Sequence, residues 1–163
     1  MGGRYGFWLL GLSLGLLPTG AEAADHTPGL VRVESPYSVE VTADRFEAIL
    51  QERGLTLFNR IDHAAGGASV GEALRPTELI IFGNPAVGTP LMQCAQSVAI
   101  DLPQKALIWE DAEGQVWFGY NQPAYLRERH DISGCDQLLE RIANVLDNLA
   151  TATTQLDESG QSR

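Results

Sequence analysis

The residue best suited to acid–base or ligand chemistry in this chain is a histidine beside a glycine-rich segment. His63 follows Asp62 at the end of a predicted strand and precedes the small residues 64–69. An imidazole there can bind a ligand or act as a base, and the small neighbours leave room for a small molecule. Asp62 does not orient His63 if the strand includes both, because strand neighbours point to opposite faces. A hydrogen-bonded structural role for His63 is the alternative.

The second candidate is the segment Gly-Asn-Pro-Ala-Val-Gly-Thr at positions 83–89, between a predicted strand and a predicted helix. Backbone N–H groups at such a junction can bind an anion, and the glycines have the spacing of a phosphate-binding loop. A nucleotide site is not expected, because Thr89 stands where that loop has lysine and Pro90 where it has a hydroxyl residue. Turn geometry explains the glycines better, with Asn84 as a turn or cap residue.

Motifs for hydrolysis and metal binding are weak in this sequence. It contains neither Gly-x-Ser-x-Gly nor His-Glu-x-x-His, and neither Ser69 nor Ser97 has an evident base. His63, Met92 and Cys94 are soft donors that would suit copper, but no two of them have a recognised ligand spacing. We therefore assign no metal site and no catalytic residue from the sequence.

The N-terminus predicts export. Residues 1–23 combine Arg4, an apolar run at 7–17 and small residues at 21–23, which is the pattern of a cleavable signal peptide. The apolar run is too short for a permanent span, so we expect cleavage near Ala23, a periplasmic or secreted protein and no stable membrane insertion. An uncleaved anchor is the alternative. The net charge of −10 disfavours nucleic acid as a partner.

The only two cysteines, Cys94 and Cys135, both lie in the part that would be exported. Thiols oxidise in that compartment, and both residues fall near predicted helix ends, so we predict a disulfide between them. The alternative is two free thiols, with Cys135 made reactive by its place at a helix N-terminus.

Hydrophobic periodicity predicts the elements that must position these residues. We expect a polar lead-in at 24–36, a strand at 37–41, a helix capped by Thr42 and closed by Gly54, a strand at 55–61, a loop at 64–69, a strand at 78–83 buried on both faces near the sheet centre, a short helix to Ala95, a hairpin of 105–110 and 115–120, a short helical piece from Gln122, a long helix capped by Ser133, and a disordered tail at 151–163.

Strands and helices do not alternate regularly in this order, which favours an α+β fold with a largely antiparallel sheet. The long C-terminal helix should cover one face of the sheet, because its apolar residues form one stripe at helical spacing. The stripe consists of Leu138, Leu139, Ile142, Val145, Leu146 and Leu149. The sequence thus predicts a single domain over 37–150.

Four ordered segments carry a resemblance to a known family: residues 60–65, 74–85, 88–92 and 101–111. From about Tyr37 to the end of the C-terminal helix, the chain resembles the bacterial and archaeal domain of unknown function 302 family. The resemblance implies a compact α+β fold with a curved antiparallel sheet, and a homodimer. It implies no established reaction, and it leaves the cofactor unknown. Cys94 and Cys135 depart from the usual pattern.

The resemblance also places Arg75 and Glu78 in one motif set with His63. We therefore expect a non-catalytic binding or interaction module that holds a small molecule near His63, Arg75, Glu78, Asn84, Gly88 and Thr89. The rival hypothesis is a metal- or haem-linked periplasmic redox protein or enzyme that uses His63.

Overall fold

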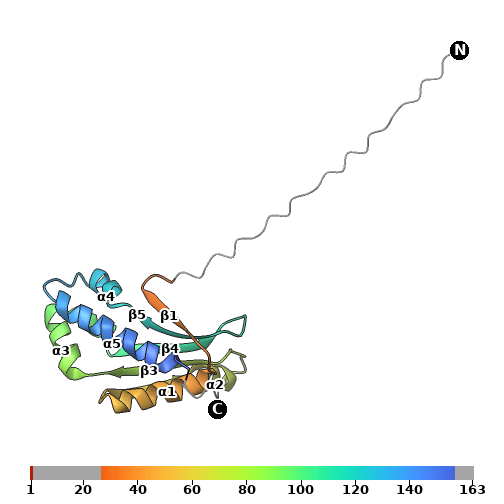
Figure 1. Cartoon of the computed structure of the whole chain (residues 1–163), viewed down its shortest axis with the longest axis horizontal. Coiled ribbons are helices and arrows are strands. Elements are labelled where there is room, and N and C mark those ends of the chain that lie inside the picture. The colour runs from red at the N-terminus through yellow and green to blue at the C-terminus, as the bar shows by residue number, and fades with distance from the viewer. Residues whose placement is uncertain (2–26, 157–163) are drawn as a thin grey trace.

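The computed structural model describes Met1 and residues 27–156, in which two helices cover one face of a five-stranded sheet (Figure 1). The strands lie in the order β1-β5-β4-β3-β2, and each neighbouring pair is antiparallel. The strands are β1 (Leu30–Ser35), β2 (Thr56–Asp62), β3 (Thr77–Gly83), β4 (Gln104–Glu110) and β5 (Val116–Asn121); the helices are α1 (Val39–Glu52), α2 (His63–Ser69), α3 (Pro85–Cys94), the 3-10 helix η1 (Gln96–Ile100), α4 (Pro123–Arg129) and α5 (Asp136–Thr154). The predicted α+β class, antiparallel sheet and long C-terminal helix are confirmed.

The segment before α1 differs from the prediction. Residues 37–41 form no strand, because the Ser38 hydroxyl accepts a hydrogen bond from the Val41 N–H at 3.2 Å and caps α1. Thr42, the predicted cap, lies inside the helix and is buried. Val39, Phe46 and Leu50 are also buried, and their spacing is helical. The short alternation at 37–41 is therefore the first part of a helical face.

The predicted polar lead-in contains an edge strand. Residues 30–35 form β1, which pairs with β5 through partners such as Val31↔Tyr120 and Val33↔Phe118. Residues opposite one another in a sheet point to the same face, so Val31 and Val33 extend the buried face of β5. The domain thus begins at Leu30 rather than Tyr37.

The strand at 78–83 is confirmed, but it is not buried on both faces. Glu78, Ile80 and Phe82 are buried, whereas the residues between them are half-buried, and β4 rather than β3 is the central strand. Helices α1 and α5 contact the sheet on the buried face only, which gives β3 its alternation. The predicted β4–β5 hairpin is confirmed.

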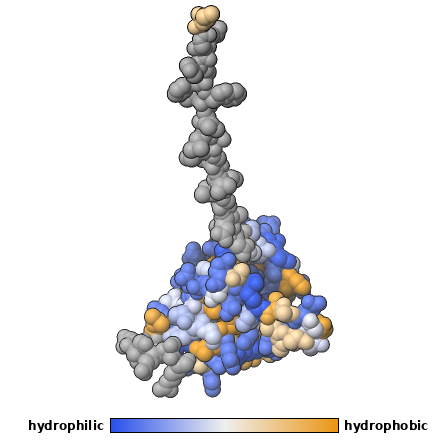
Figure 2. Space-filling view, turned by 90° about the vertical axis from the view of Figure 1, so that its right-hand side faces the viewer, coloured by the Kyte–Doolittle hydropathy of each residue, from blue (hydrophilic) through white to orange (hydrophobic). Residues whose placement is uncertain are grey.

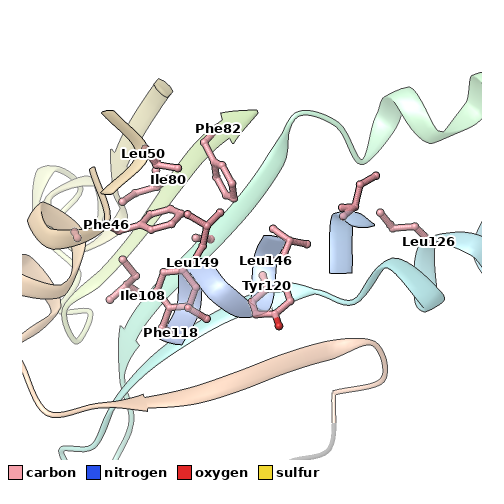
Figure 3. Close-up of a cluster of buried hydrophobic side chains, with 14 of the residues drawn as sticks. Phe46, Leu50, Ile80, Phe82, Ile108, Phe118, Tyr120, Leu126, Leu146 and Leu149 are labelled. Carbon is pink, nitrogen blue, oxygen red and sulfur yellow. The ribbon is translucent and has the colours of Figure 1, made fainter. Parts of the chain in front are cut away.

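The core lies between this sheet face and the two long helices (Figure 3). Phe46 of α1 makes edge-to-face contacts with Phe82 and Phe118, at centroid distances of 5.0 and 4.9 Å. From α5, Leu139, Ile142, Leu146 and Leu149 are buried, while Val145 of the predicted stripe is 47% exposed. Together these residues form one continuous core.

Helix α5 differs from its predicted bounds at both ends. Cys135 rather than Ser133 precedes its first turn, and no side chain caps it. The helix continues to Thr154, and Thr153 and Thr154 are buried, so residues 151–154 belong to the domain and not to a disordered tail. The predicted signal peptide, apart from Met1, and residues 157–163 lie outside the described residues.

Candidate functional site

A hollow beside α3 is a candidate binding site in the described part of the chain. Its volume is about 260 Å³, and we call it the α3 cavity. Side chains and backbone from β2, β3, α3, η1, β4 and α5 line it. The lining residues are Phe58, Gly83, Asn84, Pro85, Val87, Gly88, Thr89, Leu91, Met92, Ala99, Leu102, Pro103, Gln104 and Ile142.

The local sequence explains how α3 forms the roof of this cavity. β3 ends at Gly83, and the Asn84 side chain then accepts a hydrogen bond from the Ala86 N–H at 2.9 Å, which caps α3. Pro85 follows at the first helical position, where its missing N–H is not needed. The cap role predicted for Asn84 is confirmed, but Gly88 lies inside α3 rather than in a turn, because its N–H donates to the Asn84 carbonyl as in a helix. Leu91 anchors the helix in the core, while Val87 stays partly exposed at the rim.

The chemistry of the α3 cavity is mainly apolar and carries no charge. Its 14 lining residues include no Asp, Glu, Lys, Arg or His. Asn84, Thr89 and Gln104 are its neutral hydrogen-bonding side chains. An ionised ligand would lose its hydration there without gaining a countercharge. The arrangement therefore suits an uncharged, largely apolar molecule.

The charged half of the predicted ligand set lies elsewhere. His63 opens α2 and is exposed, and Asp62 accepts from the Ala65 N–H at 2.8 Å as the cap of that helix. The predicted loop at 64–69 is thus a short helix. Arg75 is exposed and donates through Nε to the Glu110 carbonyl at 3.1 Å. Among the described residues, no hydrogen bond joins His63 to Arg75 or Glu78.

Glu78 is held by Arg60, a residue outside the predicted ligand set. Glu78 is 8% exposed, and its carboxylate pairs with the Arg60 guanidinium, which also contacts Asp44 at 2.6 Å and Glu47 at 3.2 Å. These interactions, with that to Glu78 the largest, raise the pKa of Arg60 above its ordinary value. Glu78 therefore ties β3 to β2, and its charge is not available to a ligand at His63.

The six predicted ligand residues do not form one site. Asp62 pairs with Glu78 at the start of β3, whereas Asn84 follows its end, and a strand rises about 3.3 Å per residue, so the two groups lie roughly 20 Å apart. Figure 1 shows α2 and α3 at opposite ends of the sheet. The α2 end, which Figure 2 faces, is mainly hydrophilic with separate hydrophobic spots. Only Asn84, Gly88 and Thr89 line the α3 cavity.

The three donors of the copper hypothesis, His63, Met92 and Cys94, do not lie together either. Met92 and Cys94 lie on α3, far from His63 at the start of α2. Within residues 27–156, no group of three His, Cys, Asp or Glu side chains could hold a metal ion.

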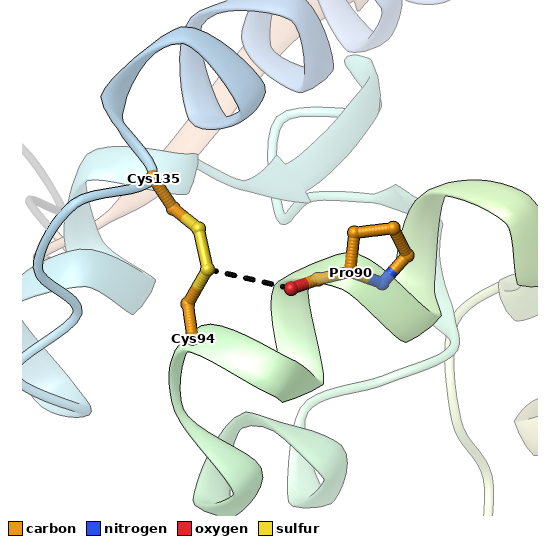
Figure 4. The surroundings of a disulfide bond; sticks show 3 residues. All are labelled: Pro90, Cys94 and Cys135. Atoms are coloured by element: carbon orange, nitrogen blue, oxygen red, sulfur yellow. Dashed lines mark hydrogen bonds between the residues drawn. A yellow bond between two sulfur atoms is a disulfide. The ribbon is translucent and has the colours of Figure 1, made fainter.

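The two cysteines are brought together as predicted (Figure 4). Cys94 ends α3 and Cys135 precedes α5, and their Cα atoms are 6.5 Å apart, within the range of a disulfide. The structure joins their sulfur atoms, which ties the C-terminal end of α3 to α5.

One expectation about serine chemistry is wrong. Ser97 does have a basic partner, since its hydroxyl oxygen lies 3.1 Å from Nδ1 of His130. Nothing in the local sequence points to His130, because it lies 33 residues away along the chain. The cavity residues Phe58 and Leu102 were not predicted either, since no motif or spacing marks them and only the fold brings them to the α3 cavity.

The fold has a counterpart among solved structures. A crystal structure of an uncharacterised conserved DUF302 protein from Bacillus stearothermophilus superimposes with a TM-score of 0.70, and the match covers 78% of this chain and 99% of that chain at 16% identity. This likeness shows a shared fold. Among the described residues, no helix is long and apolar enough to cross a bilayer.

Similarity to curated proteins is higher in sequence but partial in length. Proteins described as fluoride-specific ion channels FluC 1 of Brucella suis and Brucella abortus are each 50% identical over 104 residues. The match covers 64% of this chain but only 41% and 38% of those proteins, so the chain spans about two fifths of their length. The model of the family described as domain of unknown function DUF302 matches residues 31–149. Because that match covers most of the chain, the protein belongs to the DUF302 family.

Proposed function

We propose that this domain binds a small, uncharged and mainly apolar molecule in the α3 cavity. The observation that carries the proposal is a hollow of about 260 Å³ without a charged lining residue. Apolar lining with a few neutral polar groups is typical of ligand sites, where the polar groups orient the molecule. Half of the ligand residues predicted from the sequence, namely Asn84, Gly88 and Thr89, belong to this lining.

The size of the cavity limits the ligand. Ligand sites usually have volumes of roughly 300–1,000 Å³, so this cavity of about 260 Å³ lies just below that range and suits a single ring or a short alkyl chain. A neutral hydroxyl, ester or amide on such a molecule could hydrogen-bond to Asn84, Thr89 or Gln104.

The helix that roofs the cavity is fixed at both ends. Asn84 caps its first turn, and Cys94 at its last turn is joined to Cys135. Because α3 is fixed at both ends, little conformational entropy is lost in ordering it when a ligand binds, which favours affinity. These features support binding to a preformed site.

Filling the cavity should test the proposal directly. A Cβ at Gly88 would meet the Leu102 side chain at an ordinary 3.7 Å, so Gly88→Leu should extend into the hollow without a backbone clash. Gly66→Leu is the matched control, because a Cβ there meets nothing within 4 Å and Gly66 lies on α2. Binding of 1-octanol and octanoate, measured by calorimetry, compares ligands of equal chain length and different charge.

We expect 1-octanol to bind at least tenfold more tightly than octanoate, and Gly88→Leu to weaken octanol binding at least tenfold while Gly66→Leu leaves it unchanged. Equal binding of octanol by the folded Gly88→Leu variant would refute the site. Tighter binding of octanoate would refute the uncharged ligand class.

We further propose that the chain works as a homodimer formed through the sheet face opposite α1 and α5. That face presents a half-buried apolar strip in which Leu79 lies opposite Leu107 and Trp109 opposite Trp117. Light scattering should give twice the mass of one chain. Leu107→Glu should give a single-chain mass, whereas Val145→Glu on the exposed side of α5 should not; a single-chain mass for the wild type would refute the dimer.

We propose that the chain is exported, because residues 1–23 have the pattern of a cleavable signal peptide. Cell fractionation should find a periplasmic or secreted chain lacking residues 1–23. The full-length chain in the membrane pellet would contradict cleavage near Ala23.

A second candidate role comes from the curated relatives. We propose that the domain works alongside a fluoride-specific ion channel, because 104 of its residues align at 50% identity with proteins so described. A strain lacking this protein should then stop growing at a lower sodium fluoride concentration than its parent, with sodium chloride as the control. Equal fluoride tolerance of the two strains would count against this role.

The rival class is a metal- or haem-linked redox protein that uses His63. His63 is exposed on a short helix and has little support from neighbouring ligands among the described residues. A stoichiometric metal, or a visible absorption band in purified protein, would favour this class over a binding module.

A further inference from the structure

A serine, a histidine and an aspartate form a hydrogen-bonded chain beside η1. The Ser97 hydroxyl oxygen lies 3.1 Å from Nδ1 of His130, and Nε2 of His130 lies 2.5 Å from Oδ2 of Asp101. Ser97 lies in η1 and Asp101 directly follows it, while His130 directly follows α4. Two turns that are distant in sequence thus place a hydroxyl and a carboxylate on the two nitrogens of one imidazole.

The contacts determine which ring nitrogen carries the proton. An ionised carboxylate only accepts hydrogen bonds, so Nε2 of His130 donates to Asp101. In the neutral ring Nδ1 then has a lone pair and accepts from the Ser97 hydroxyl. A neutral ring with its lone pair toward the hydroxyl can take the proton of serine, here through Nδ1, whereas in the serine protease triad the serine faces Nε2 and the aspartate faces Nδ1.

Burial separates the roles of the three side chains. The side chains of His130 and Asp101 are 6% and 13% exposed, so the ring is held in a sheltered position. Ser97 is exposed and can meet a substrate from solution. The guanidinium of Arg129 also lies 3.3 Å from Oδ2 of Asp101, which divides the carboxylate's charge between two partners. We expect proton transfer from Ser97 to His130 to be only modestly favoured, because the shared Asp101 carboxylate stabilises a protonated imidazole less than an unshared one would.

We propose that Ser97 is the nucleophile of an acyl-transfer site, with His130 as its general base and Asp101 as the residue that positions His130. The substrate class is a short-chain carboxylic ester, since an open surface hydroxyl places few limits on a small acyl group. In the first step Ser97 Oγ bonds to the carbonyl carbon, its proton moves to His130 Nδ1, and the leaving alcohol departs with that proton. Water then cleaves the acyl-serine, giving its proton to His130, and releases the carboxylic acid as Ser97 regains a proton.

A fluorophosphonate probe on the full chain, with intact-mass detection, should test for an activated serine. We expect one adduct, located on Ser97, and slow hydrolysis of p-nitrophenyl acetate. Ser97→Ala should abolish both, and His130→Gln should slow labelling by about 100-fold or more. Ser69→Ala is the matched control and should label normally, because the Ser69 hydroxyl donates to the Gly66 carbonyl at 2.6 Å and contacts no imidazole.

Asp101→Asn separates a positioning role from a structural one. Removing the carboxylate's charge disfavours the protonated ring, so the rise of the labelling rate with pH should move to lower pH. This readout also decides the proposal if His130→Gln fails to fold. The absence of an adduct, an adduct at another serine, wild-type labelling of a folded His130→Gln protein, or an unshifted pH profile would each overturn it. Labelling of Ser97 and calorimetric binding of 1-octanol are separate measurements, so failure of this proposal and failure of the α3 cavity are distinguishable.

Discussion

Reducing the bridge between Cys94 and Cys135 should destabilise the domain without changing its fold. The bridge joins the end of α3 to the residue before α5 and closes a loop with a sequence separation of 41 residues. Both sulfur atoms lie beside the core rather than within it, since each cysteine is only partly buried against the core cluster. The main effect of reduction is therefore on the unfolded chain, which regains the freedom of that loop.

The expected loss follows from the length of the loop. In the chain-entropy model, a loop of this size corresponds to about 4 kcal/mol at 25 °C. A domain of about 130 residues unfolds with an entropy of roughly 0.27 kcal/mol/K near 60 °C, so the melting temperature should fall by about 15 °C. This loss is a sizeable share of the 5–15 kcal/mol of net stability that is typical of a domain.

Thermal unfolding followed by circular dichroism, with and without a thiol reductant, measures this loss. The Cys94→Ala/Cys135→Ala double variant is the control, since it should melt like the reduced wild type and not respond to the reductant. Peptide mapping without reductant should recover the two cysteines as one linked pair. Two alkylatable thiols in freshly isolated protein would refute the reasoning. So would a decrease in melting temperature of less than about 3 °C on reduction.

Four further substitutions test the core and the β4–β5 turn. Ile142→Asp places an unpaired charge in the buried stripe of α5 and should abolish cooperative unfolding. Val145→Asp is the control and should melt close to the wild type, because Val145 is 47% exposed. Two equally stable variants would show that the buried face of the helix is wrongly assigned. Phe46→Ala removes a fully buried ring and should cost about 3–5 kcal/mol in urea unfolding, and a cost below about 1 kcal/mol would contradict its central place. The Asp111 carboxylate accepts hydrogen bonds from the Trp117 indole, the largest cause, and from backbone N–H groups, which lowers its pKa below the ordinary 3.8. The ionised Asp111 carboxylate therefore contributes its full stabilisation above about pH 3.8, and this contribution is lost as pH falls through the lower pKa of the folded state. The difference in melting temperature between wild type and Asp111→Ala should shrink in acid. A difference that stays constant with pH would contradict a stabilising role for the carboxylate charge.

Local patterns predicted several elements well. The stripe of α5, the β4–β5 hairpin and the cap at Asn84 were all predictable, because each depends on residues within a few positions of one another. The pairing of Cys94 with Cys135 was predictable because the chain has only two cysteines.

Short and ambiguous patterns misled the prediction. The alternation at 37–41 fits both a short strand and the first turn of an amphipathic helix, and the hydroxyl of Ser38 selects the helix by capping it. β1 is an edge strand with a single partner, so its six residues carry only a weak pattern.

The candidate sites depended on tertiary structure to a greater degree. The family-like motif cluster led us to place His63 and Asn84 in one site, but the length of β3 holds them at opposite ends of the sheet. The partner of Glu78 is Arg60 on the neighbouring strand, a contact set by strand register. Pairing across a sheet is not encoded in the spacing of residues along the chain.

By itself, the sequence determined the fold class, the long helix, the cysteine pair and the cap at Asn84 that opens a helix. Only the tertiary structure decided that this helix covers an uncharged cavity, and that Ser97 meets His130 across 33 residues of chain. The physical reason is the range of the interactions. Caps, helical stripes and hairpins are formed by near neighbours, whereas a cavity or a hydrogen-bonded chain of side chains requires distant segments to pack in one particular arrangement.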